Sequence, residues 1–203
     1  MSYAWGVDRK TPASAEAMLD RTVSGAAAGR ALWGLRRPVF MALALFMAIA
    51  LVRGYLLEVY VVVGDSMQPS LQPDQHLLVS KLAVGPIERS AVLVFAHPSA
   101  PRRHLVKRVV GLPGETVSIE AGRVFVSRAD GPRRELGEGY LEPAFNDPGA
   151  YASETTVPEG CYYVLGDNRE NSKDSRNFGV VFKERIIGRA LFSLWPPGLI
   201  SRD

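Results

Sequence analysis

The chain has 203 residues, with 24 Lys and Arg against 21 Asp and Glu, and a single cysteine. This length allows one domain with a substantial core plus an appendage, and one cysteine excludes both an internal disulfide and a cysteine-based zinc site. Six basic and three acidic residues lie in residues 1–37, so the remainder is electrically balanced and has no electrostatic reason to bind nucleic acid.

The most apolar stretch of the chain, residues 38–57, predicts one transmembrane helix. Residues 38–52 contain no charge, and Arg53 can extend its charged end to an interface. A helix needs ~20 apolar residues to cross ~30 Å of hydrocarbon, so the stretch is long enough to span a bilayer once.

Basic residues abut the start of this stretch, which predicts its orientation. The basic group comprises Arg30, Arg36 and Arg37. Because positive charge favours the cytoplasmic side, we expect residues 1–37 to form a cytoplasmic tail of the cell membrane protein and residues 58–203 to form an extracytoplasmic domain.

Two other interpretations of the apolar stretch remain open. It could be the h-region of a cleaved signal peptide, since Ala48-Ile49-Ala50 provides an A-x-A pattern, although residues 1–37 are long for an n-region. It could also be a buried core helix of a soluble domain, because its length exceeds that of such helices only modestly.

The rest of the chain alternates short β-branched runs with Gly, Pro and Asp turns, which predicts a mainly antiparallel β-sheet domain. Residues 128–155 are polar and rich in Gly and Pro, so we expect a small inserted lobe or loop there. The predicted strands are Val59–Val63, Leu77–Ser80, Ala91–Ala96, Leu105–Val110, Thr116–Ile119, Arg123–Ser127, Tyr162–Leu165 and Ile186–Leu194.

Ser66 lies just after the first of these strands and is followed by Pro69. A serine in this position is usually a turn residue whose hydroxyl bonds nearby backbone. As a nucleophile it would need a base to take its proton. The three histidines are widely separated and lack a local acidic partner, so they are poor candidates for that base, and we expect no metal or other cofactor.

Lys107 is a better candidate for the base. Strand alternation places it between Leu105 and Val109 on one face, and turns His104 and Arg108 to the other. A lysine on a strand is more often a residue that protects a sheet edge. If it is buried, desolvation can lower its pKa by up to ~3–5 units from ~10.4, which populates the neutral amine that a general base requires.

A third stretch, residues 166–179, is dense in Asp, Asn, Ser and Arg and follows an apolar strand. Such a stretch is ordinarily a solvated loop. Its acidic residues and arginines could instead lock it through charge-assisted hydrogen bonds, and a locked loop could present a hydroxyl to a buried amine.

Residues 64–71, 107–115 and 166–179 together, in this order and behind an apolar helix, resemble the conserved boxes of bacterial type I signal peptidases. The resemblance covers nearly everything after residue 38. It implies a catalytic β-sheet domain with a small accessory lobe, membrane-bound through one N-terminal helix.

The resemblance also implies roles for individual residues. Ser66 corresponds to the nucleophile and Lys107 to the general base, while Ser172 would orient the amine. The residues that would hold the third stretch in shape are Asp167, Asp174 and Arg176. The Ser66 backbone N–H would serve the oxyanion hole; some members add a hydroxyl donor two residues earlier, where this chain has Gly64, so a backbone group or water is expected there.

The implied reaction is removal of signal peptides from secretory preproteins after a small-x-small motif, through an acyl-enzyme. The substrate would pair in extended form with strand edges, and the protein would also contact membrane lipid. The residues expected to bind the substrate are Val61, Val62, Val63 and Met67. Alternatives are a specialised pilin or conjugation-factor peptidase of this family, and a catalytically inactive, membrane-anchored binding module.

Overall fold

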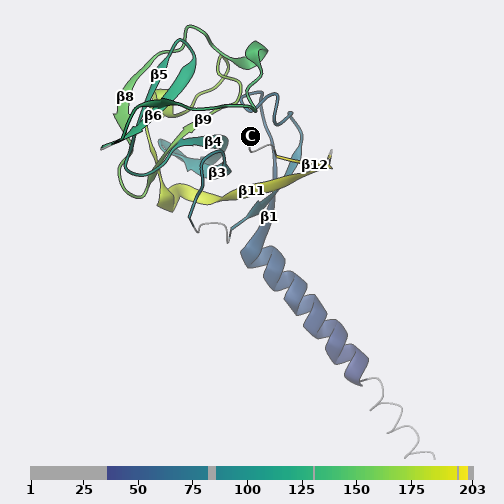
Figure 1. Ribbon diagram of the computed structural model, residues 1–203. Helices are drawn as coiled ribbons and strands as arrows, with labels where there is room; N and C mark the ends of the chain where they lie inside the picture. The colour runs from purple at the N-terminus through teal and green to yellow at the C-terminus, as the bar shows by residue number, and fades with distance from the viewer. Residues whose placement is uncertain (1–35, 82–85, 130, 196, 201–203) are drawn as a thin grey trace, which may run out of the picture. The chain divides into compact units, whose positions relative to one another are not determined.

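The computed structural model describes residues 36–81, 86–129, 131–195 and 197–200 (Figure 1). Nearly all of the predicted tail, residues 1–37, therefore lies outside the described residues. The chain divides into two compact units, with the boundary between Leu51 and Val52.

One apolar helix, Arg36–Leu56, is long and apolar enough to cross a membrane. It is rich in Ala, Leu and Met, which favour helix, and it contains no proline after Pro38. It starts two residues before the predicted span and ends one residue before its end. Its last part is a π-helical turn, η1 (Val52–Leu56), and strand β1 (Leu57–Val61) follows directly.

The second unit contains two sheets in which every pairing is antiparallel, so the predicted mainly antiparallel β fold is confirmed. The larger sheet has eight strands in the order β1-β2-β11-β3-β4-β9-β10, and β12 pairs with β11. Its remaining strands are β2 (His76–Ser80), β3 (Val92–His97), β4 (Ala100–Gly111), β9 (Cys161–Leu165), β10 (Val181–Phe182), β11 (Ile186–Trp195) and β12 (Pro197–Leu199).

The smaller sheet has four strands in the order β7-β6-β5-β8. Figure 1 shows β5, β6 and β8 grouped at one end of the unit, with β1, β11 and β12 at the other. Ala121 and Gly122 join β5 to β6 with φ of 49° and 75°, the left-handed pair that suits a tight hairpin. The strands are β5 (Glu115–Glu120), β6 (Arg123–Arg128), β7 (Arg134–Glu135) and β8 (Ala152–Thr156).

The segment predicted as an inserted lobe, residues 128–155, supplies β7, the short helix η2 (Pro143–Phe145) and most of β8. The smaller sheet itself begins earlier, at Glu115, because β5 and β6 are its central strands. These two strands bury alternate side chains in one apolar cluster with residues of β9. Residues 128–155 therefore add the edge strands β7 and β8 to a sheet that is already packed. The buried residues of β5 and β6 in this cluster are Val117, Ile119, Val124 and Val126.

Strand β4 runs from solvent into the core and carries the centre of the site. Residues 100–104 are exposed and Lys107–Gly111 are buried. Strand β3 pairs along β4 as far as Arg108, whereas β9 pairs only with Arg108, Val109 and Gly111. Among the described strands, the β4 edge before Arg108 is therefore covered on the β3 side alone.

Candidate active site

The turn that carries Ser66 follows β1 and is anchored by two buried apolar side chains. Met67 and Leu71 are each 1% exposed and lie in an apolar cluster with residues of β2, β3 and β11. The Leu71 N–H donates to the Met67 carbonyl at 2.8 Å. Burying two side chains of this size contributes about 1.5–3 kcal/mol each, so the Ser66 backbone is held on a packed base.

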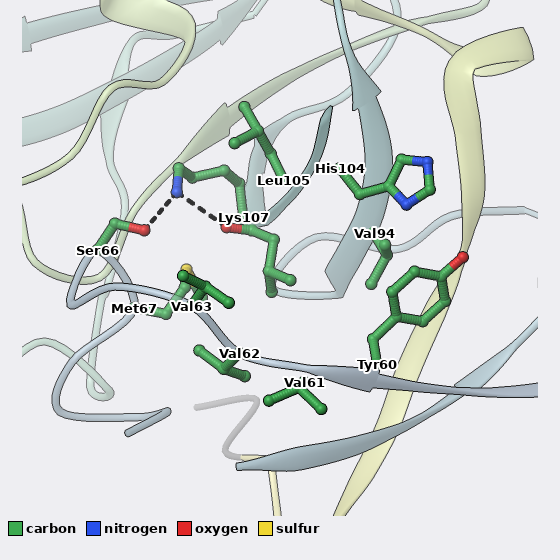
Figure 2. A pocket seen from close by; sticks show the side chains of 11 residues that line it. Tyr60, Val61, Val62, Val63, Ser66, Met67, Val94, His104, Leu105 and Lys107 are labelled. Carbon is green, nitrogen blue, oxygen red and sulfur yellow. Dashed lines mark hydrogen bonds between the residues drawn. The ribbon is translucent and has the colours of Figure 1, made fainter. Parts of the chain in front are cut away.

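Lys107 reaches Ser66 from the point where β4 enters the core. Its side chain is buried, with the residue 2% exposed. Its Nζ lies 2.6 Å from Ser66 Oγ and donates a hydrogen bond to the Val106 carbonyl at 2.9 Å (Figure 2). The structure thus brings together two residues that are 41 positions apart in the chain.

Burial lowers the pKa of Lys107 to about 8. Asp174 and Asp167 oppose this by attracting the ammonium, while Arg103 and Arg176 add to it by repulsion. Desolvation is the largest of these effects, because an ammonium taken out of water loses its hydration. A substantial fraction of Lys107 is therefore neutral near pH 7–8, as a base requires.

Ser172 lies at the same site without bonding the amine. Its Oγ is buried and has no hydrogen-bond partner among the described residues. The Lys107 amine is bonded instead to Ser66 Oγ and the Val106 carbonyl. The expected hydrogen bond between Ser172 and Lys107 is thus absent here, and Ser172 Oγ lies against Gly166, where an added Cβ would be 2.2 Å away.

Asp174 and Arg176 bond each other within the third stretch. Asp174 caps the helical turn α2 (Ser175–Phe178), accepting from the Arg176 N–H at 3.2 Å and from Arg176 Nε at 2.8 Å. Its other oxygen accepts from the Gly166 N–H at 3.0 Å, and Arg176 donates to the Arg169 carbonyl at 2.8 Å. These bonds close the loop on itself.

Asp167 has a partner that the sequence analysis missed. Arg108, fully buried, donates to both carboxylate oxygens of Asp167 at 2.9 and 2.7 Å. The same guanidinium donates to Ser70 Oγ at 3.2 Å and to the Ser90 carbonyl at 3.0 Å. Strand alternation did place Arg108 opposite Lys107, which was the available signal for a separate role.

Asn168 joins this loop to the Ser66 turn and was also missed. Its backbone N–H donates to the Ser66 carbonyl at 3.1 Å, and its side-chain amide donates to the Asp65 carbonyl at 3.2 Å. An amide in a polar loop gives no sequence signal for so distant a partner. The contact ties the position of Ser66 to the shape of the loop.

The backbone at Gly64 and Ser66 bears on the expected oxyanion donors. Gly64 has φ of 87°, a conformation that favours glycine, and is exposed. Among the described residues, no acceptor bonds the Ser66 N–H. This N–H is therefore available as an oxyanion donor, whereas Gly64 offers no side-chain hydroxyl.

Two cavities flank Ser66 and Lys107. The first, of about 100 Å³, is lined by Val61, Val62, Val63 and Met67 together with Ser66, Lys107 and residues of β4 (Figure 2). At its far end the His104 ring packs edge-on against Tyr60, with ring centres 5.7 Å apart.

The second cavity, of about 580 Å³, is larger and more polar. It meets the first at Ser66 and Lys107, and Ser172 lies in its wall with four charged side chains. The charged residues of the wall are Asp65, Arg103, Glu170 and Lys173. Within the described part of the chain, no group of three or more His, Cys, Asp or Glu side chains could hold a metal ion.

Comparison with known proteins identifies the family. Residues 35–195 match the family described as signal peptidase, peptidase S26. Signal peptidase I of Bacillus caldolyticus is 37% identical over 172 residues, which span 80% of this chain and 91% of that protein. Signal peptidase IB of Staphylococcus aureus N315 is 32% identical over 164 residues, spanning 74% and 84%.

Among solved structures, a signal peptidase I from Enterococcus faecalis V583 is 33% identical, with a TM-score of 0.42, and the match covers 51% of this chain and 95% of that one. The sequence matches confirm the predicted family and the predicted class of enzyme, a serine endopeptidase of the signal peptidase I type. The chain belongs to the peptidase S26 family of signal peptidases.

Proposed function

We propose that this protein is a membrane-bound endopeptidase that removes signal peptides from secretory preproteins after a small-x-small motif, with Ser66 and Lys107 as its catalytic dyad. The observation that carries the proposal is the 2.6 Å contact between Ser66 Oγ and a buried lysine whose pKa is lowered to about 8. Its membership in a family of signal peptidases provides the substrate class.

Acylation begins when the neutral Lys107 amine takes the Ser66 proton. Ser66 Oγ then attacks the scissile carbonyl carbon, and the Ser66 N–H stabilises the negative charge that develops on the carbonyl oxygen. The tetrahedral intermediate collapses as the Lys107 ammonium gives its proton to the leaving nitrogen. The C–N bond breaks, the mature protein departs with a free amine, and the signal peptide remains as an ester on Ser66.

Deacylation repeats these steps with water. The regenerated Lys107 amine takes a proton from a water that attacks the ester carbonyl, and Lys107 returns that proton to Ser66 Oγ as the ester bond breaks. The second cavity leaves room for this water beside the dyad. Hydrolysis thus ends with the signal-peptide carboxylate and the dyad in its starting state.

The first cavity supports the preference for small side chains. An extended substrate would lie between residues 61–63 and the part of the β4 edge before Arg108, which β9 does not cover. It would form backbone hydrogen bonds with both. Its side chains then alternate between cavity and solvent. The first cavity, of about 100 Å³ and lined mainly by apolar side chains, could receive small apolar side chains of such a substrate.

The helix Arg36–Leu56 would anchor the enzyme in the cell membrane, with the N-terminal side in the cytoplasm because Arg36 and Arg37 lie at its start. Ser66 follows the helix by ten residues, which limits the connecting chain to about 33 Å. The dyad thereby stays within reach of a signal peptide that is itself held in the bilayer and in contact with lipid.

Cleavage of a preprotein panel tests the proposal. Full-length protein in detergent is incubated with several preproteins, each also as a variant with Phe replacing the small residue before the cleavage site. We expect cleavage of several parents, at the small-x-small site by N-terminal sequencing, and none of the Phe variants. Ser66→Ala is the matched control and should cut nothing. Cleavage by Ser66→Ala, or failure to cut any parent, would overturn the proposal.

A further inference from the structure

We propose that Glu138 is a positioning residue for the nucleophile: by pairing with the buried Arg169, it holds the loop that carries Gly166 and Asn168 against the backbone of Ser66. The inference rests on the proposed function, because it takes Ser66 as the nucleophile. Glu138 lies in the segment that the sequence predicted as an inserted loop, so no catalytic motif points to it.

Glu138 and Arg169 form a buried pair. Their side chains are 7% and 2% exposed, and the Arg169 guanidinium donates to both carboxylate oxygens of Glu138, to one of them at 3.1 Å. The paired carboxylate raises the pKa of Arg169 against the desolvation that lowers it. A buried guanidinium without this partner would have to move toward water or draw water inward.

Arg169 passes this constraint to the loop. Its Nε donates to the Gly166 carbonyl at 3.0 Å, and its backbone N–H donates to the Phe145 carbonyl at 2.8 Å. The Arg169 side chain is therefore bonded to the loop at Gly166, and its backbone is bonded to the segment after Glu138 at Phe145. The rigid fork of the guanidinium fixes the direction of Gly166 relative to Glu138.

The loop in turn touches the nucleophile. The Asn168 N–H donates to the Ser66 carbonyl at 3.1 Å. At Gly166 the approach is so close that an added Cβ would lie 2.5 Å from the Ser66 carbonyl oxygen and 2.2 Å from Ser172 Oγ. Gly166 therefore lies against the Ser66 backbone and Ser172 with no room for a side chain between them, so its position and theirs are linked.

Tyr140, two residues after Glu138, contacts the other buried arginine, Arg108. Its hydroxyl donates to Glu138 at 2.5 Å, and its ring lies 3.9 Å beneath the Arg108 guanidinium. Burial and the nearby Glu138 carboxylate raise the pKa of Tyr140, so its hydroxyl stays protonated as a donor. Arg108 bonds Asp167 and Ser70, which lie on the loop and on the Ser66 turn.

The test compares Glu138→Gln with a matched control, Glu115→Gln. Glu115 also pairs with an arginine, Arg89, and is 3% exposed, but it belongs to β5 and bonds no residue of the loop. We expect Glu138→Gln to lower kcat by about 10- to 100-fold with KM within about threefold, because a small misplacement of a reacting group has effects of this size. The control should lower Tm and leave kcat within about threefold.

A double variant, Glu138→Gln with Arg169→Gln, separates positioning from folding. It removes both buried charges, so Tm should recover toward wild type, while kcat stays low because the bond to the Gly166 carbonyl is lost. Tyr140→Phe, which keeps the ring over Arg108, should lower kcat less. All variants are assayed as full-length protein at a temperature where circular dichroism shows them folded.

Recovery of kcat together with Tm in the double variant would overturn the inference, as would a kcat in Glu138→Gln equal to that of Glu115→Gln. The proposed function fails by a different result, namely cleavage by Ser66→Ala or no cleavage by wild type. Wild-type cleavage that depends on Ser66, with unaltered kcat in Glu138→Gln, would contradict the positioning role alone.

Discussion

Lys107 and Arg108 are adjacent on β4 and both buried, but their side chains lie on opposite faces of the strand and have different partners. Arg108 faces one side of the sheet and meets the Asp167 carboxylate through two hydrogen bonds. Lys107 faces the other side and, among the described residues, bonds only uncharged atoms, Ser66 Oγ and the Val106 carbonyl. Two neighbouring, buried basic side chains thus have different partners, a carboxylate for Arg108 and two uncharged oxygens for Lys107.

This difference gives two neighbouring residues different roles: Arg108 contributes to stability, and Lys107 can take part in proton transfer. An arginine remains charged in any protein environment, so a buried one requires a compensating anion. A lysine can lose its proton, and desolvation without a directly bonded carboxylate favours that loss. The structure places the residue that can titrate beside the serine, and the one that cannot beside the aspartate that supports the loop.

The largest expected effect comes from removing the amine. We expect Lys107→Met to lower kcat at least about 10⁴-fold, as for other residues that act as one unit with a nucleophile. It should also raise the free energy of unfolding at pH 7 by up to about 3 kcal/mol, and with it Tm, because the lowered pKa in the folded state makes the buried ammonium unfavourable. Turnover by this variant above about a hundredth of wild type would remove Lys107 from the mechanism.

The stability effect has a defined pH window. The pKa of Lys107 is about 8 in the fold and near 10.5 when unfolded, so the unfolded chain binds more protons between these values. The cost is fully present below about pH 8 and vanishes as pH rises above about 10.5. The gain in Tm of Lys107→Met over wild type should therefore shrink across this range.

Asp167→Asn should have the opposite effect on stability. It deprives the buried Arg108 guanidinium of its carboxylate, a change that costs about 3–5 kcal/mol in such pairs. Thermal unfolding followed by circular dichroism measures the loss as a lowered Tm, and the drop should exceed that of an exposed pair such as Arg123→Gln. Equal drops would show that Arg108 finds sufficient compensation elsewhere.

The pH–rate profile tests the neutral amine directly. Because only unprotonated Lys107 can take the Ser66 proton, kcat/KM should rise about tenfold per pH unit at low pH and level off above about pH 8. A peptide substrate without groups that titrate in this range isolates the enzyme's own ionisation. A midpoint near 6.5 would instead assign the base to a histidine.

Ser172→Ala should affect turnover more than stability. The buried hydroxyl has no partner among the described residues, so its removal should change Tm little. If the hydroxyl bonds the amine during the reaction, kcat falls by about tenfold or more. An unchanged kcat would show that Ser172 contributes packing against Gly166 and no orienting bond.

The smallest expected effect is that of Arg103→Gln. Arg103 is exposed and lowers the pKa of Lys107 by repulsion, an effect smaller than desolvation and larger than the repulsion from Arg176. Its removal should move the midpoint of the pH–rate profile upward, with less than about a threefold loss of rate at pH 7, and added salt should mask the change. A downward shift would contradict the repulsion.

Much of this arrangement could be predicted from local pattern. Period-two alternation separated Lys107 from Arg108, and the apolar runs marked eight of the strands to within a few residues. Burial of Lys107 could not be derived locally, because it depends on segments distant in the chain, such as the turn whose Ser66 contacts Lys107 from 41 positions earlier.

Two other features were beyond the sequence for similar reasons. The Glu138–Arg169 pair joins residues 31 positions apart, and its acidic member lies in a stretch whose Gly and Pro content predicts only a loop. The structure has no hydrogen bond from Ser172 Oγ to Lys107, and residue types alone do not determine such a contact. The strands could thus be predicted from the sequence, whereas the contacts between side chains distant in the chain could be seen only in the structure.

The uncovered edge of β4 creates a hazard that the chain counters with its own composition. An edge that accepts one extended peptide could in principle accept any other, including the same strand of a second molecule. Just before the dyad this edge carries Pro101, which has no N–H to donate, and the charged pair Arg102 and Arg103. These residues discourage self-association and aggregation at the outer part of the edge, while Leu105 and Val106, next to the dyad, stay open to a visiting chain.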